Sequence, residues 1–112
     1  MASTIEQPNV IQNATVNSDK VTAGYVYYVK EGHLVTVTGV FNITSVSSGD
    51  VLATGLPISV LHVNLGFFYA LNNNTANSEG KLYMDGSTGE LKASSIVPNN
   101  SSLRFAFSYV AE

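Results

Sequence analysis

The sequence of 112 residues contains no cysteine and no tryptophan, and only 12% of its residues are charged. Without cysteine, neither disulfide bonds nor thiolate metal sites can form. Five lysines and arginines stand against eight aspartates and glutamates, which gives a net charge of −3 and leaves no basic patch. Phosphate backbones and anionic membranes both attract clusters of basic residues. We therefore expect no nucleic-acid binding and no membrane insertion.

Long apolar runs are also missing, and none approaches the length of a membrane-spanning helix. The first eight residues have neither the charged region nor the apolar region of a secretory signal peptide. We expect residues 1–8 to form a flexible leader and residues 9–112 to form one domain. A domain of this size can bury a hydrophobic core without covalent staples.

What the sequence does have is apolar residues at every second position, which is typical of a β-strand with one face in a core. In the longest such pattern, all odd positions from Leu61 to Leu71 are apolar, which predicts a long strand over residues 60–71. The predicted core residues are Val35, Val37, Phe41, Leu65, Phe67, Leu82, Leu103, Phe105 and Phe107.

Turn signals divide the rest of the chain into short strands. Glu31-Gly32-His33 and Asp85-Gly86 both predict tight hairpin connections, with glycine supplying the unusual backbone conformation. Strands are expected at residues 10–16, 23–30, 34–44, 51–54, 60–71, 81–84, 90–93 and 103–110. About eight short strands predict an all-β protein, either an antiparallel β-sandwich or a jelly roll. The strand order is left open.

Several strands carry apolar side chains on both faces. Val26 and Tyr28, for example, stand beside Tyr25, Tyr27 and Val29. A two-layer sandwich has only one inner face per sheet, so a second apolar face indicates burial against another subunit. Scattered surface apolar residues, which every protein has, are the alternative explanation.

The sequence carries no catalytic pattern. Its two histidines, His33 and His62, lack the neighbouring acidic cluster of a metal site. No pair of carboxylates suggests acid–base chemistry, and no serine stands in a nucleophile elbow. Asp85 lies in a tight turn, where aspartate usually accepts a hydrogen bond from its own backbone. We expect a protein that is not an enzyme and that uses no cofactor and no metal.

Aromatic and asparagine side chains suggest a saccharide site. A sugar ring stacks on an aromatic face, and polar side chains contact its hydroxyl groups. The predicted ligand-binding residues are His62, Tyr69, Asn73, Asn74 and Asp85, with Tyr83 and the rest of the 72–74 loop nearby. Core tyrosines with their hydroxyls at the rim are the alternative.

Four segments in order resemble the pattern of bacteriophage tail-fibre and baseplate receptor-binding proteins. Residues 27–41 (YYVKEGHLVTVTGVF) resemble a hairpin common in these proteins. A short strand with a Leu-Pro step then corresponds to residues 52–57 (LATGLP), and a glycine-flanked hairpin to residues 80–91 (GKLYMDGSTGEL). The last strand closes on an aromatic pair in residues 107–109 (FSY).

This resemblance implies the C-terminal head domain of a virion protein in a phage tail or baseplate, normally carried by a stalk in a longer fibre. Such heads are usually homotrimers with a β-sandwich or jelly-roll fold. They bind polysaccharide or protein on the bacterial surface during adsorption and contact other phage tail proteins. Their ligand residues vary between phages, so the resemblance transfers none.

Two other functions stay open. The domain could be a structural tail, baseplate or decoration domain that holds virion proteins together without touching the host. It could also be a small polysaccharide-degrading enzyme, which the missing pair of acids disfavours.

Overall fold

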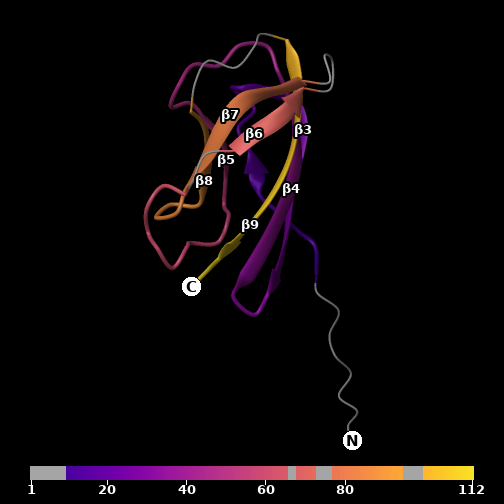
Figure 1. Ribbon diagram of the computed structural model, residues 1–112. Coiled ribbons are helices and arrows are strands. Elements are labelled where there is room, and N and C mark those ends of the chain that lie inside the picture. The colour runs from indigo at the N-terminus through magenta and orange to yellow at the C-terminus, as the bar shows by residue number, and fades with distance from the viewer. Residues whose placement is uncertain (1–9, 66–67, 73–76, 95–99) are drawn as a thin grey trace, which may run out of the picture.

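The computed structural model describes residues 10–65, 68–72, 77–94 and 100–112, and every regular element in these ranges is a β-strand (Figure 1). The strands are β1 (Gln12–Asn13), β2 (Thr15–Val16), β3 (Val21–Glu31), β4 (Leu34–Ile43), β5 (Val51–Thr54), β6 (Phe68–Asn72), β7 (Asn77–Asp85), β8 (Glu90–Ala93) and β9 (Ser101–Val110). The prediction of an all-β protein is confirmed. Among the described residues no helix is long and apolar enough to cross a membrane.

The hairpin of β3 and β4 forms where the sequence predicts it. Glu31 pairs with Leu34, so the connection consists of Gly32 and His33 alone. Gly32 has a backbone φ of 59°, a conformation that glycine adopts without steric cost. The second predicted hairpin is also confirmed, since β7 and β8 are joined by a tight turn in which Asp85 pairs with Glu90.

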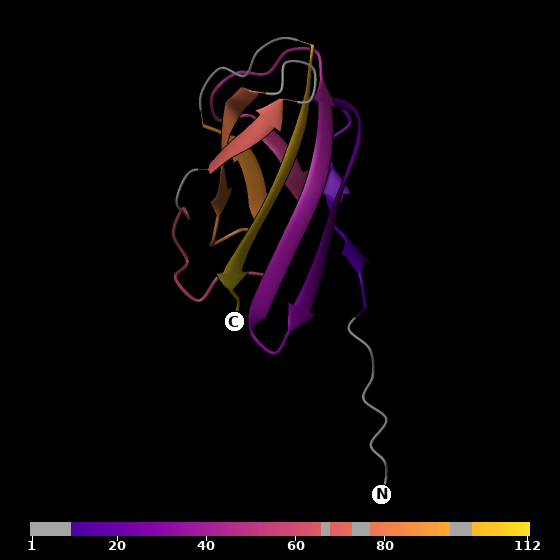
Figure 2. The same cartoon turned by 45° about the vertical axis from the view of Figure 1, so that its right-hand side comes forward.

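The strands follow the order β1-β3-β4-β9-β6-β7-β8-β5-β2, and all neighbouring pairs are antiparallel. β4 and β9 pair along ten residues, whereas β6 meets β9 at only two pairs. The hydrogen-bonded order therefore folds into two layers at this narrow junction. Figure 2 shows β3, β4 and β9 in one layer and the strands β5 to β8 in the other.

The core fills the space between these layers. Six of the predicted core residues, which lie on β4, β7 and β9, are buried: Val35, Val37, Phe41, Leu82, Leu103 and Phe105. Leu65 and Phe107 are half-buried and pack against this cluster, and Phe67 lies outside the described residues. Gly39 makes room for the Phe105 ring, because a Cβ atom there would lie 2.5 Å from Phe105 Cζ.

The long strand predicted over residues 60–71 is wrong in its first half. β6 begins only at Phe68, and residues 60–65 form a connection joined to its surroundings by isolated contacts (Figure 1). Ser59 starts a turn there: its Oγ accepts from the Leu61 amide at 3.2 Å, and its carbonyl accepts from the His62 amide at 3.3 Å. His62 then adopts a φ of 52°. The turn breaks the two-residue alternation, so Leu61 is 65% exposed.

The first predicted strand, over residues 10–16, is divided in two. β1 pairs with β3 in one layer, and β2 pairs with β5 in the other. Ala14 between them donates its amide hydrogen to the Val26 carbonyl at 2.9 Å. The chain crosses from layer to layer at this residue, and a continuous strand could not do so.

Candidate functional site

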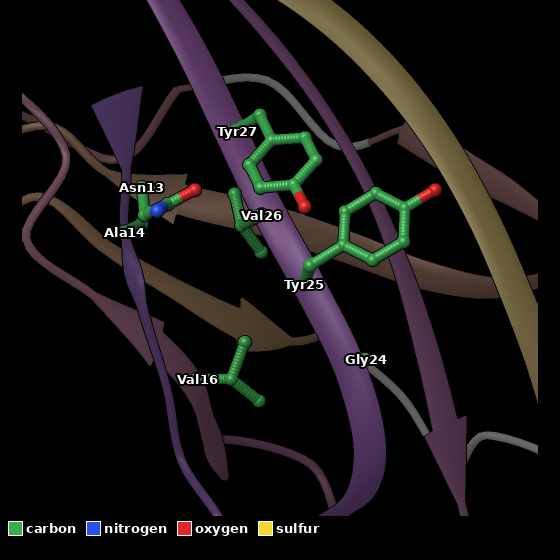
Figure 3. A pocket seen from close by; sticks show the side chains of 7 residues that line it. All are labelled: Asn13, Ala14, Val16, Gly24, Tyr25, Val26 and Tyr27. Carbon is green, nitrogen blue, oxygen red and sulfur yellow. The ribbon is translucent and has the colours of Figure 1, made fainter. Parts of the chain in front are cut away.

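Two tyrosines on the outer face of β3 form the most ligand-like surface among the described residues. The rings of Tyr25 and Tyr27 stack with centroids 4.5 Å apart and planes inclined by 22°. They are 43% and 37% exposed, whereas Val26 between them is 1% exposed. Side chains alternate along a strand, so Val26 takes the core position and both tyrosines face outward. Figure 3 shows the two rings on the same side of β3.

An open pocket of about 320 Å³ lies beside this pair (Figure 3). It is lined by Asn13, Ala14, Val16, Gly24, Tyr25, Val26 and Tyr27. Asn13 pairs with Tyr27 across the ladder of β1 and β3, so the two side chains project to the same face of the sheet. An asparagine amide offers two donors and one acceptor, so it can contact neighbouring hydroxyl groups of one ligand.

Tyr27 also borders a second hollow of about 140 Å³ on the same face. The other residues that line it are Ile11, Tyr28, Val29, Thr36 and Thr38. Within the described part of the chain, neither Tyr25 nor Tyr27 uses its hydroxyl in a hydrogen bond. We call the surface formed by Asn13, Tyr25 and Tyr27 the tyrosine surface. It combines stacked aromatic faces with free hydroxyl and amide groups.

No protein-family model, curated protein or solved structure matches this chain. The chemistry of the surface itself therefore carries the functional conclusion.

The sequence-predicted site residue His62 lies elsewhere, on the connection between β5 and β6. Its imidazole Nε2 pairs with the Glu112 carboxylate, and both side chains are about half exposed. The Glu112 amide in turn donates to the Ile58 carbonyl at 3.0 Å. These contacts tie the 58–62 segment to the end of the described chain.

Asp85 has a structural partner set within its own turn. Its Oδ1 accepts from the Ser87 amide at 3.0 Å and from Ser87 Oγ at 2.7 Å, and Lys92 Nζ lies 3.6 Å from Oδ2. The Ser87 hydroxyl, followed by the Ser87 amide, lowers the pKa of the Asp85 carboxyl below its usual value. The expected hydrogen bond from the turn backbone to the Asp85 carboxylate is confirmed.

The side-chain positions of the other predicted ligand residues are not described. Tyr69 belongs to β6, where its backbone pairs with Lys81. Asn73 and Asn74 lie outside the described residues. The described contacts do not join His62 to Asp85, so a saccharide site built from these five residues stays a prediction.

A metal site has no candidate cluster in the described ranges. They contain no group of three or more histidine, aspartate and glutamate side chains that could hold a metal ion. His33 has a structural contact instead, because its Nδ1 lies 3.0 Å from the Ala111 carbonyl oxygen.

The sequence carries one signal that points to the tyrosine surface. Between Gly24 and Tyr28, a valine separates two tyrosines. Alternate side chains of a strand point to opposite faces, so either Val26 or the pair of tyrosines can face the core. Burying the tyrosines would remove two phenol hydroxyls from water, whereas burying Val26 removes no polar group. This rule assigns Val26 to the core and Tyr25 and Tyr27 to the surface.

Proposed function

We propose that this domain is a non-enzymatic head domain of a phage tail or baseplate protein that binds saccharide on the host surface during adsorption. The proposed head is a β-sandwich that assembles as a homotrimer. One observation carries the saccharide part: the stacked, exposed pair of Tyr25 and Tyr27 beside the Asn13 amide. The virion setting is supported by the resemblance of the sequence to receptor-binding heads.

The tyrosine surface suits a sugar for physical reasons. The apolar C–H face of a pyranose packs on an aromatic ring, and the exposed phenol hydroxyls and the Asn13 amide can exchange hydrogen bonds with the sugar hydroxyls. The pocket is open and shallow, so a single site should bind weakly. Adsorption then depends on several copies that bind one polysaccharide together.

The direct test is saccharide binding by variants of the tyrosine pair. On a glycan array and on purified bacterial cell-wall polysaccharide, we expect Tyr27→Ala to reduce binding by at least about tenfold, the scale of one lost stacking contact. Tyr27→Phe keeps the ring and should keep most of the binding. Ser45→Ala, which truncates an exposed residue at the opposite end of the sheet from the β3–β4 turn, is the matched control.

A second candidate function is a structural domain that binds other virion proteins and not the host. The observation that favours it is an exposed apolar group, which we call the end patch: Leu34, Val60, Leu61, Val63 and Val110. Leu34 pairs with Val110, and the Val60 amide donates to the Val110 carbonyl at 3.2 Å, so Leu34, Val60 and Val110 adjoin one another. A pocket of about 400 Å³ opens within it.

The two functions differ in the binding partner, which is host saccharide in the first and another virion protein in the second. Failure of the wild-type protein to bind bacteria or any cell-wall polysaccharide, with retained binding to another protein of the same virion, would favour the structural function. Release of reducing ends from the polysaccharide would instead show an enzyme.

A further inference from the structure

Arg104 lies on the same outer face as the tyrosine surface. Tyr25 pairs with Val40, and Val40 pairs with Arg104, so the three residues form one row across β3, β4 and β9. Directly paired residues of antiparallel strands project to the same face. Two strand spacings separate the Cα atoms of Tyr25 and Arg104 by roughly 10 Å. A sugar stacked on the tyrosines therefore has Arg104 within reach of the adjoining unit of the same chain.

The charge of Arg104 is not neutralised within the described part of the protein. Lys20 and Lys92 approach carboxylates at 3.4 Å and 3.6 Å, whereas Arg104 has no ion pair among the described residues. Its side chain is exposed. The protein as a whole has a net charge of −3, so the guanidinium of Arg104 is a positive site on a negatively charged molecule.

The described positions that flank Arg104 on this face are uncharged. On β4, Val40 lies opposite, and Thr38 and Asn42 lie diagonally; on β6, Leu71 pairs with Arg104. Along β9, Ser102 and Ala106 are the neighbours on the same face. No carboxylate at these positions competes for the guanidinium, so an anionic group of a ligand can bind it.

We infer that the tyrosine surface and Arg104 together select saccharides that carry an acidic group, a carboxylate or a phosphate, on the sugar unit next to the stacked ring. This inference rests on the proposed saccharide-binding function. The planar guanidinium offers two parallel N–H donors, which match the paired oxygens of either acidic group. The stacking contact supplies binding to the ring, and Arg104 supplies preference for the acid.

The test uses the full chain and matched pairs of acidic and neutral probes. One pair is oligogalacturonate and its methyl ester, and a second is oligoglucuronate and its methyl ester. A phosphorylated disaccharide and its unphosphorylated form test the phosphate separately. Affinities are measured by NMR titration at low and at high salt. Wild type, Arg104→Gln, Arg104→Lys and Tyr27→Ala are compared.

For wild type we expect at least one acidic probe to bind about tenfold more tightly than its neutral partner. This difference in affinity is the scale of one charge-assisted hydrogen bond. High salt should reduce this preference, because exposed charges are screened. Arg104→Gln should bind the acidic and the neutral probe equally, while Tyr27→Ala should weaken both. Arg104→Lys should keep part of the preference, since lysine retains the charge but not the paired donors.

The outcomes separate the two levels of the proposal. Equal binding of acidic and neutral probes by wild type, with loss of both in Tyr27→Ala, would overturn the role of Arg104 and leave the saccharide function intact. An acid preference that survives in Arg104→Gln would likewise overturn the inference. No binding of any probe by wild type would count against both the inference and the saccharide function. A preference only for the phosphorylated disaccharide over its unphosphorylated form would identify phosphate as the acidic group.

Discussion

Phe105 occupies the middle of the core, beneath the gap that Gly39 leaves on the neighbouring strand. Its ring lies 5.1 Å from that of Phe41, and the residue is 7% exposed. We expect Phe105→Ala to lower the free energy of unfolding by about 3–5 kcal/mol, because the substitution removes a buried ring and leaves a cavity. Chemical denaturation measures this change, and a variant as stable as wild type would show that the inward face of β9 is assigned wrongly.

The control for this substitution is the next residue along β9. Ala106 is exposed on the outer face, so Ala106→Ser should change the stability by no more than about 0.5 kcal/mol.

The lowered pKa of Asp85 makes a small part of the stability depend on pH. A carboxyl whose pKa is lower in the folded state stabilises the fold above its unfolded pKa, near 3.9, and loses this effect as the pH falls through the folded pKa. Ser87→Ala removes the hydroxyl donor but keeps the amide donor. We expect wild type to be more stable than Ser87→Ala at pH 7 by at most about 1 kcal/mol, because solvent screens this turn.

Denaturation at pH 7 and at pH 2.5 tests this dependence. The difference between wild type and Ser87→Ala should become smaller at the lower pH, and NMR titration should show a higher Asp85 pKa in the variant. Ser108→Ala is the control: its hydroxyl pairs with Thr36, which does not titrate, so its effect should not change with pH. A difference that persists unchanged at pH 2.5 would contradict the assigned cause.

At the level of the elements, the turn between β7 and β8 is held against the chain that follows β5. Gly89 has a φ of 77°, and a Cβ atom there would lie 2.0 Å from the Leu56 carbonyl oxygen. Gly49 has a similar φ of 88°, but a Cβ atom there would meet nothing within 4 Å. An alanine at either position would adopt a similarly strained backbone conformation, but only at Gly89 would its Cβ atom clash with a neighbour.

This pair separates strain from crowding. We expect Gly49→Ala to cost about 1–2 kcal/mol, the usual penalty of the left-handed conformation. Gly89→Ala should cost a further 1–3 kcal/mol or more, because the Leu56 backbone must move. Denaturant midpoints of the two variants provide the comparison. Equal losses would mean that the turn and the segment after β5 are not packed as described.

The elements also show where sequence reasoning works and where it stops. Gly32 and the Asp85-Gly86 pair determine their hairpins locally, so both hairpins could be predicted. The segment from Val60 to Leu65 alternates like a strand, but its conformation depends on distant contacts: Ser59 bridges to Ala111, and the Gly86 amide bonds the Val63 carbonyl. A short-range pattern contains no information about such partners.

The candidate site was harder to predict than the fold for a related reason. The position of Arg104 beside Tyr25 depends on the order of β3, β4 and β9, and the sequence leaves strand order open. The sequence predicts His62 and Asp85 as ligand residues because polar side chains contact the hydroxyl groups of a sugar. Both side chains instead make contacts that stabilise their own turns or chain ends.

For the molecule as a whole, we expect the end patches of the copies to contact one another in the proposed trimer. Burying Leu34 and Val110 between copies would remove exposed apolar surface from water. We expect sedimentation at micromolar concentration to give a trimer, and Leu34→Asp with Val110→Asp to dissociate it. The affinity of each site for a short oligosaccharide should stay unchanged. Binding to a surface coated with polysaccharide should fall by about 10²–10⁴, the loss expected when avidity disappears.

The matched control adds the same two charges at the opposite end of the sheet, at the exposed residues Thr44 and Ser45. Thr44→Asp with Ser45→Asp should leave both the trimer and the surface binding intact, because these residues lie outside the end patch. A wild-type monomer would contradict the trimer itself. A trimer that persists in Leu34→Asp with Val110→Asp would place the contact between copies on another face, and the tyrosine surface would be the next to test, since assembly there would hide the rings that we propose bind sugar.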